Sequence, residues 1–549
     1  MSTGATPHEG PATGEPAPAF RQRLGLFDAT MLVAGSMIGS GIFIVPAAIA
    51  GDVGSSGWIL AVWVLTGGMT IFGALSYGEL AAMMPRAGGQ YVYLREAYSP
   101  LWGFLYGWTL FLVIQTGTIA AVGVAFAKFL GVMVPALGTD PGAGARVLFE
   151  TSILWPQFAS QPVLQPMLFQ VTAGQAVGVF VVVLLTAVNC LGVQEGKWVQ
   201  NLFTVAKMLA LALLIVLGFA LATNSAVLAA NTQDWWAGIK ATKRYEEVHA
   251  FMPLAGVAAL MVMGGAMVGS LFAADAWNNV TFTAGEVRNP RRSLPLSLAL
   301  GTGMVIGLYL LANVVYLTSL PVRGDAALAE QLKEEAKAAK TPADRAKLDQ
   351  RYKEATLRLG IDHARDERVG TAVMELVAPS IGVQAMAIGI MLSTFGCTNG
   401  LILSGARLYY AMARDGLFFR SVGRLNRHGV PAAGLILQAV WASLLTFSGT
   451  YGQLLDYVIF AALLFYVLTA TGLFVLRRKR PDAERPYRAV GYPVVPAVYV
   501  FLCAVVMLDL LFVKPLYTWP GLVIVLSGIP VYFLWRRQTN HQLQVTSDK

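Results

Sequence analysis

The stretch Gly35-Ser36-Met37-Ile38-Gly39-Ser40-Gly41-Ile42-Phe43 interrupts an apolar segment that runs from about residue 24 to residue 50. Three of its nine residues are glycine and two are serine, and these residues are poor helix formers. One interpretation is close packing of two helices, which small residues allow. The other is a membrane helix that unwinds here, so that free N–H groups and a half-helix N-terminus bind an anion.

The composition of the whole chain is that of an integral membrane protein. Of its 549 residues, 56% are hydrophobic and only 13% are charged, against roughly 25% charged in soluble domains. We predict an all-α membrane protein with twelve spans, each near the roughly 20 residues that a bilayer core requires. The predicted spans are 26–50, 57–83, 99–133, 170–191, 198–222, 252–284, 294–320, 379–412, 430–448, 453–476, 493–514 and 518–535.

Short basic stretches fall on one side of this twelve-span arrangement. They precede span one and follow spans two, six, eight, ten and twelve, as at 288–292 and 477–480. The positive-inside rule therefore predicts a multi-pass protein of the cell membrane with both termini in the cytoplasm. Because the net charge of +9 gathers in these short loops, we expect the lipid bilayer, and no nucleic acid, as a partner.

Span six carries a second interruption. Residues 264–270 are small and glycine-rich, and they are followed by Leu271-Phe272-Ala273-Ala274-Asp275-Ala276-Trp277-Asn278-Asn279. An ionisable group such as Asp275 is expensive inside a membrane span and usually faces a cavity, although it could simply cap a second half-helix. Spans one and six begin two five-span halves, and paired interruptions of this kind indicate a transporter binding site.

This pairing predicts the domain organisation. A Pro/Gly-rich outer loop (134–169) lies within the first half. The predicted units are a disordered cytoplasmic tail (1–22), a first repeat (23–222), a second repeat (223–476) with an extracellular insertion (323–369), two last spans with a basic cytoplasmic loop (477–536) and a cytoplasmic tail (537–549).

Lys207 lies ten residues into span five, about 15 Å along the helix from its cytoplasmic end. Snorkelling from that depth is costly. We therefore expect the ammonium group to face inward and to bond backbone carbonyls of the broken first helix, where a sodium ion would otherwise lie.

Further polar residues in the spans allow two interpretations. Span eight contains small and hydroxylic residues at 393–400, which either face the cavity or pack between helices. Acidic and basic residues near the cytoplasmic ends either close an inner gate or form surface ion pairs. These candidate gate residues are Glu79, Glu286, Arg288, Arg407 and Arg414.

Several classes of function are disfavoured by what the sequence lacks. All five histidines lie in predicted tails or loops, which removes intramembrane haem ligands and an HExxH metal site. There is no Walker A sequence for ATP coupling. We expect no enzyme activity, no metal and no cofactor.

Taken together, the motifs resemble those of the amino acid–polyamine–organocation superfamily, and most closely the L-type amino acid transporter family with its bacterial members. The resemblance covers roughly residues 22–480. Its matching stretches are Gly35–Phe43, Tyr77–Leu80, Pro85–Tyr91, Phe203–Lys207, Phe272–Trp277, Gly285–Pro290, Phe395–Gly400, and Arg407 with Ala413–Gly416.

The resemblance implies a LeuT-like fold, with two inverted five-helix repeats, discontinuous helices 1 and 6 and two trailing helices. It implies that N–H groups of the first break bind the substrate α-carboxylate, that carbonyls of the second bind the α-amino group, and that Phe272 closes over the substrate. Lys207 would take the place of a coupling sodium ion. The implied substrate-binding residues are Met37, Ile38, Gly39, Ser40, Gly41, Phe272, Ala273 and Asp275.

Two departures from the family pattern bear on partners. Eukaryotic members pair with a glycoprotein through a cysteine in the loop after span three, but residues 134–169 contain none, so we expect no disulfide-linked heavy chain. The insertion at 323–369 is longer than the usual loop, and its role is not predicted.

The predicted function is sodium-independent, alternating-access exchange of neutral L-amino acids. The alternatives are a proton-coupled or cationic amino acid permease, suggested by Asp275 and Lys207, and a non-transporting amino acid sensor.

Overall fold

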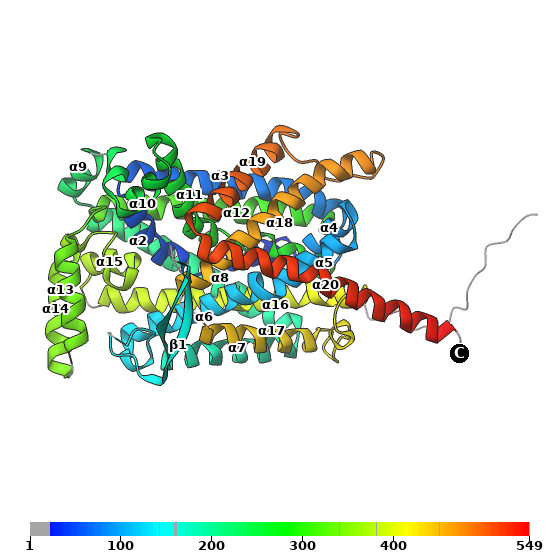
Figure 1. Cartoon of the computed structure of the whole chain (residues 1–549), viewed down its shortest axis with the longest axis horizontal. Coiled ribbons are helices and arrows are strands. Elements are labelled where there is room, and N and C mark those ends of the chain that lie inside the picture. Colours follow the sequence, from blue (N-terminus) through cyan, green and yellow to red (C-terminus); the bar gives the residue numbers. More distant parts are fainter. Residues whose placement is uncertain are drawn as a thin grey trace, which may run out of the picture.

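The computed structural model describes residues 22–141, 143–158, 162–233, 235–339, 341–379, 381–448 and 451–547. Most of the long helices lie along the longest axis of the molecule (Figure 1). The helices up to residue 251 are α1 (Leu26–Met37), α2 (Gly41–Val53), α3 (Ser56–Met83), α4 (Gln90–Ala97), α5 (Pro100–Thr109), α6 (Gln115–Met133), α7 (Ala173–Leu191), α8 (Val193–Leu217), α9 (Ser225–Gln233) and α10 (Lys243–Phe251). The remaining helices are α11 (Ala255–Ala273), α12 (Pro290–Ser319), α13 (Ala326–Ala338), α14 (Pro342–Leu359), α15 (Val369–Val377), α16 (Ile381–Arg414), α17 (Ala432–Ser448), α18 (Tyr451–Lys479), α19 (Val494–Val513) and α20 (Pro515–Ser547).

Eleven helical segments of the described chain are long and apolar enough to cross a membrane. Helices α1 and α2 together form the first of them, and α5 and α6, joined by the π-helical turn η1 (Leu110–Ile114), form the third. Helix α17 is apolar but shorter. These segments make the chain a multi-pass membrane protein, while the count of twelve spans, with α17 as the ninth, stays a prediction.

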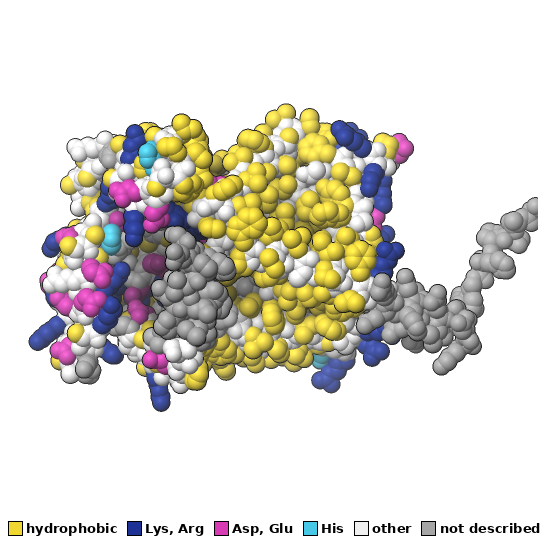
Figure 2. Space-filling view, viewed as in Figure 1, with side chains coloured by type: hydrophobic (Ala, Val, Ile, Leu, Met, Phe, Trp, Pro, Cys, Tyr) yellow, Lys and Arg dark blue, Asp and Glu magenta, His cyan; other side chains and the backbone are white. Residues whose placement is uncertain are grey.

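The face of the molecule shown in Figure 2 has an apolar belt between two charged ends. Large apolar side chains such as Phe180, Trp198 and Leu202 are exposed, as expected where the solvent is lipid. We call the end at which α1 begins and α18 finishes with Arg477-Arg478-Lys479 the basic end. We call the opposite end, which carries α13 and α14, the insertion end (Figure 1).

The first membrane helix breaks inside the predicted stretch. Helix α1 ends at Met37, residues 38–40 are not helical, and α2 begins at Gly41. A Cβ atom added to Gly41 would lie 2.6 Å from Cβ of Ala273 and 2.9 Å from its Cα. Glycine is therefore required at Gly41 because α2 begins directly against the end of α11.

The second break differs in form from the expected pair of half-helices. Helix α11 ends at Ala273, Ala276 adopts a left-handed conformation with φ 63°, and only the short turns η5 (Trp277–Thr281) and η6 (Ala284–Glu286) follow. Asp275 therefore does not cap a second α-helix. Its carboxylate accepts a hydrogen bond from the Tyr466 hydroxyl instead.

The two long loops between spans contain regular structure. In the loop predicted at 134–169, β1 (Val147–Phe158) and β2 (Pro162–Thr172) pair antiparallel, although the sequence there has no strong period. The strand continues to Thr172, so the following helix α7 begins at Ala173 and not at the predicted residue 170. The insertion at 323–369 forms the helices α13 and α14, whose shared apolar cluster contains Ala329, Leu332, Leu348, Tyr352, Ala355 and Leu359.

The predicted tails have different outcomes. Residues 1–21 of the predicted N-terminal tail lie outside the described residues. In the predicted C-terminal tail (537–549), residues up to Ser547 continue helix α20.

Candidate functional site

The two helix breaks meet at the centre of the bundle. The N-terminus of α2 starts at Gly41, and the first N–H groups of a helix have no partners within it and lie at the positive end of its dipole. The hydroxyl of Tyr309, on α12, lies 3.1 Å from the carbonyl oxygen of Met37 and 3.1 Å from that of Ala273. The Tyr309 hydroxyl thus contacts both breaks. The N-terminal N–H groups of α2 lie opposite the C-terminal carbonyls of α11.

Lys207 is fully buried on α8, and it binds backbone carbonyls of the first break. Its ammonium nitrogen donates to the carbonyl oxygens of Gly35 (2.7 Å), Ile38 (2.8 Å) and Ser393 (3.1 Å). A lysine ammonium has three donors, so these bonds use all of them. The Ser393 hydroxyl, on α16, donates to the Gly39 carbonyl at 2.8 Å.

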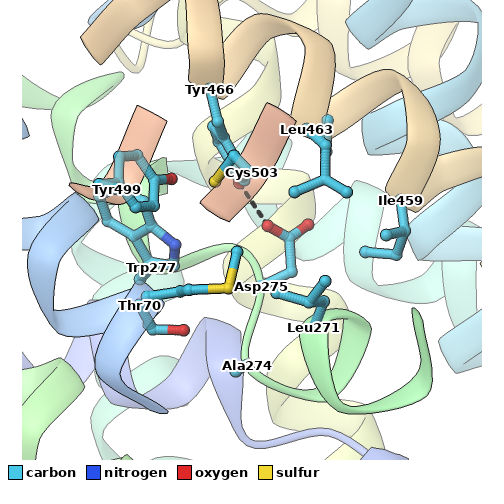
Figure 3. Close-up of a pocket in the computed structure, with 12 residues that line it drawn as sticks. Thr70, Leu271, Ala274, Asp275, Trp277, Ile459, Leu463, Tyr466, Tyr499 and Cys503 are labelled. Atoms are coloured by element: carbon cyan, nitrogen blue, oxygen red, sulfur yellow. Dashed lines mark hydrogen bonds between the residues drawn. The ribbon is translucent and has the colours of Figure 1, made fainter. Parts of the chain in front are cut away.

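The buried carboxylate of Asp275 lies between two small cavities. The first, of about 20 Å³, lies among α3, α11, α18 and α19, and Figure 3 shows Thr70, Trp277 and Tyr499 around it. The second, of about 10 Å³, is lined on α6 by Gln115. A water molecule needs roughly 10–15 Å³ of such volume, so neither cavity holds an amino acid and the site is closed.

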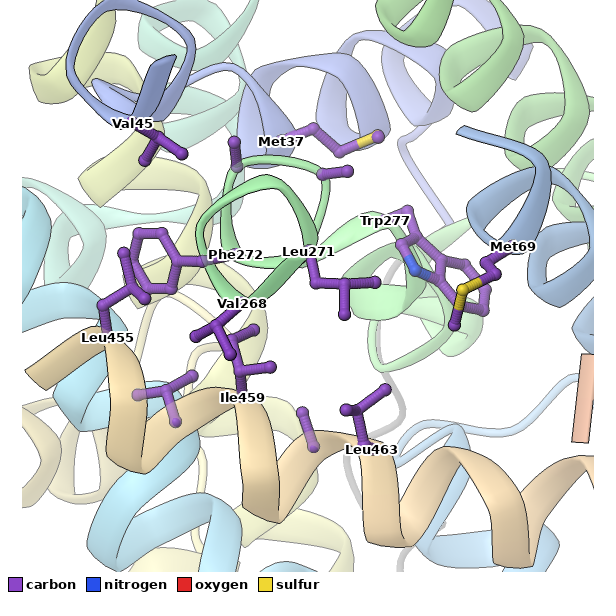
Figure 4. Packing of buried hydrophobic residues seen from close by; sticks show 14 of the residues in the cluster. Met37, Val45, Met69, Val268, Leu271, Phe272, Trp277, Leu455, Ile459 and Leu463 are labelled. Carbon is purple, nitrogen blue, oxygen red and sulfur yellow. The ribbon is translucent and has the colours of Figure 1, made fainter. Parts of the chain in front are cut away.

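Phe272 lies on the last turn of α11, toward the insertion end. It is 7% exposed and belongs to the main apolar cluster of the bundle. Figure 4 shows its ring directed toward Leu455 of α18, near Val45 of α2. An apolar layer therefore covers the breaks on this side.

Two buried carboxylates, Glu286 and Glu79, form ion pairs toward the basic end. Glu286 and Arg407 pair at 3.0 Å, and each side chain is 1% exposed. Glu79 pairs with Arg477 at 2.6 Å and with Arg485 at 3.4 Å. The Glu286–Arg407 pair is therefore an interior contact, whereas buried Glu79 meets an Arg477 side chain that is 22% exposed.

The other predicted gate cations do not join these pairs. Arg414 is exposed, and the Nε of Arg288 donates to the carbonyl of Gln22. Within the described residues, neither is found in an ion pair with Glu79 or Glu286.

Sequence reasoning missed several residues of this site. Tyr309, Tyr466 and Gln115 are isolated polar residues in apolar spans, and nothing in their spacing marks them. Arg477 belongs to a basic run that was interpreted only as a signal of orientation, because a run of charges does not reveal which side chain turns inward.

Comparison with known proteins finds one family and a set of relatives. The family described as amino acid permease matches residues 28–538. The large neutral amino acids transporter small subunit 2 of Homo sapiens is 29% identical over 534 residues, covering 96% of this chain and 83% of the relative. The b(0,+)-type amino acid transporter 1 of Homo sapiens is 27% identical, covering 94% and 88%. The Asc-type amino acid transporter 1 of Mus musculus is 27% identical, covering 94% and 82%.

Proposed function

The chain belongs to the amino acid permease family, and from that premise we propose that it exchanges neutral L-amino acids across the cell membrane by alternating access and without sodium. Amino acid transport in general follows from the family and its transporter relatives. The neutral substrate class is suggested by the relatives named for large neutral amino acids.

The bonding of Lys207 carries the proposal of sodium independence. Its ammonium group donates to carbonyl oxygens of Gly35, Ile38 and Ser393, which come from the first break and from α16. Backbone carbonyls of an unwound helix are ligands that sodium uses in transporters of this architecture. A fixed positive charge on the same oxygens repels a second cation, so transport needs no sodium.

The two breaks supply the proposed substrate contacts. The N–H groups around Gly39, Ser40 and Gly41 bind the α-carboxylate, favoured by the dipole of α2. The α-amino group binds carbonyl oxygens at the end of α11, around Phe272 and Ala273. The substrate side chain extends toward Asp275 and the cavities beside it.

We propose alternating access because the site is covered on both sides. Parting of Glu286 from Arg407 opens it toward the basic end, and withdrawal of Phe272 opens it toward the insertion end. With the LeuT-like arrangement, residues 23–222 and 223–476 form the two inverted repeats. The basic end is then cytoplasmic, with both termini, by the positive-inside rule.

The chain is proposed to work without a disulfide-linked heavy chain. The loop at 134–169 contains no cysteine, and Cys397 and Cys503 are buried. The protein purified alone should therefore exchange substrate after reconstitution.

A cationic substrate is the second candidate, and the position of Asp275 favours it. This carboxylate is buried, and its one side-chain donor is the Tyr466 hydroxyl in the described part of the chain. A lysine or arginine side chain reaching the cavities would provide a charged partner. Relatives of the b(0,+) type are among the similar proteins.

Counterflow separates these functions. Proteoliposomes loaded with unlabelled amino acid are diluted into labelled leucine, with sodium or choline outside. Equal, competitor-sensitive accumulation in both salts supports sodium-independent exchange, and absence of counterflow across a broad panel of amino acids rejects it. Competition by arginine and lysine that Asp275→Asn removes would favour the cationic candidate. Accumulation driven by a pH gradient without internal substrate would favour proton coupling, and binding without transport would favour a sensor.

A further inference from the structure

Outside the proposed substrate site, one carboxyl group has no hydrogen-bond partner in the part of the chain that the structure describes. Asp509 lies on α19, one helical turn before that helix ends at Val513. Both of its carboxyl oxygens are buried, and neither has a partner among the described residues. Other carboxylates inside the bundle are paired: Asp275 with Tyr466, Glu79 with Arg477 and Glu286 with Arg407. Asp509 is therefore unexplained by packing or by ion pairing.

The helix that faces Asp509 is α11, which ends in the second break. A Cβ atom added to Gly264 would overlap the Oδ2 atom of Asp509. Helix α11 contains no titratable residue from Ala255 to Ala273. The backbone of α11 at Gly264 therefore lies directly against the Asp509 carboxyl group, and no side chain of α11 donates a hydrogen bond to it.

The cations near Asp509 are already engaged. Arg244, on α10, donates to the Val513 carbonyl at 2.9 Å and pairs with Glu247 at 3.1 Å. Lys514 pairs with Asp456 of α18 at 2.7 Å. The remaining charged groups of the packed elements are Asp52 at the end of α2, Lys243, Glu246 and His249 on α10, Glu79 far off at the basic end of α3, Arg477, Arg478 and Lys479 at the basic end of α18, and Arg536 near the far end of α20.

A carboxylate in this position is expensive when charged. An ionised group buried in a span without donors loses its hydration and gains no partner, whereas a neutral acid against Gly264 avoids the larger cost of burying a charge. Ionisation would draw water or the Arg244 guanidinium toward Asp509. A water molecule or the guanidinium group can reach Asp509 only if α19 and α11 move apart.

From this geometry we propose that Asp509 is a proton-binding site served by the aqueous solution at the insertion end, and that its neutral form holds α11 against α19. Water at that end supplies the proton to the carboxylate and takes it back on release. Release loosens α11 and so biases the second helix break. The effect on transport rests on the proposed function, but proton binding does not.

Infrared difference spectroscopy on the purified full-length protein tests proton binding directly. Spectra collected as the pH falls from about 8 to about 5 should show a protonated-carboxyl band that is lost in Asp509→Asn and retained in Glu367→Gln. Glu367 is a matched control because it lies at the same end but pairs with Lys128 at the surface. An Asp509→Asn spectrum identical to that of the wild type would overturn the proposal.

The pH profile of counterflow tests the coupling. With the pH varied only on the insertion side, the wild-type rate should change several-fold, whereas Asp509→Asn should stay flat at the wild-type acidic value. Gly264→Ala, which crowds the carboxyl group, should shift the midpoint of the profile. A wild-type profile in Asp509→Asn overturns the coupling. Absence of counterflow in every variant, with the infrared band still assigned to Asp509, would reject the proposed function and leave the proton site standing.

Discussion

Substitution of Gly41 by alanine probes the proposed carboxylate site with one added methyl group. The new Cβ atom would lie 2.6 Å from Cβ of Ala273 and 2.9 Å from its Cα, whereas carbon atoms in optimal contact are about 3.5–4.0 Å apart. Helix α2 must therefore move roughly 1 Å away from α11. Overpacking of this kind costs about 1–3 kcal/mol.

The same movement should weaken substrate binding. Hydrogen bonds to a charged group contribute about 1.5–3 kcal/mol each. Loss of one N–H bond to the α-carboxylate therefore lowers affinity by about tenfold to about 150-fold, at 1.4 kcal/mol for each factor of ten.

The assay is competition for labelled substrate in counterflow, with thermal unfolding of the detergent-solubilised protein in parallel. Gly51→Ala is the matched control, because it lies on the same helix and an added Cβ there meets nothing within 4 Å. We expect Gly51→Ala to match the wild type in substrate affinity and to unfold at the same or a slightly higher temperature, since alanine favours a helix over glycine. Normal substrate affinity in a folded Gly41→Ala protein would refute the location of the carboxylate site.

Three further substitutions test other parts of the site. Lys207→Met removes the ammonium donor from the carbonyl oxygens of Gly35, Ile38 and Ser393, although Ile38 keeps the Ser393 hydroxyl at 3.2 Å. An unpaired buried acceptor costs about 1–3 kcal/mol, so we expect lower thermal stability and slower counterflow; unchanged counterflow would contradict the proposed role. Under the cationic candidate, Asp275→Asn should abolish competition by arginine while leucine exchange persists; equal loss of both would assign Asp275 a structural role only. Arg407→Gln strands the buried charge of Glu286 and should cost about 3–5 kcal/mol, seen as a lower unfolding temperature, and adding Glu286→Gln should recover part of it; no recovery would contradict the importance of the pair.

The sequence by itself determined the features that depend on local composition. The membrane class follows from the number and length of apolar segments, because a bilayer requires about 20 apolar residues in each spanning helix. The position of the first break follows from three glycines within nine residues. The depth of Lys207 follows from counting along a helix of known rise.

Only the tertiary structure decided what these features contact. The meeting of Gly41 with Ala273, the contact of Tyr309 with both breaks and the pairing of Glu79 with Arg477 all join residues far apart in the chain. In a soluble protein, apolar periodicity marks the buried face of a helix. In a membrane protein the lipid-facing and protein-facing sides are both apolar, so the sequence does not reveal which polar residues turn inward. Along the chain, Asp509 is therefore only one polar residue in an apolar span. Once α19 packs against α11, it is a buried acid without a partner among the described residues.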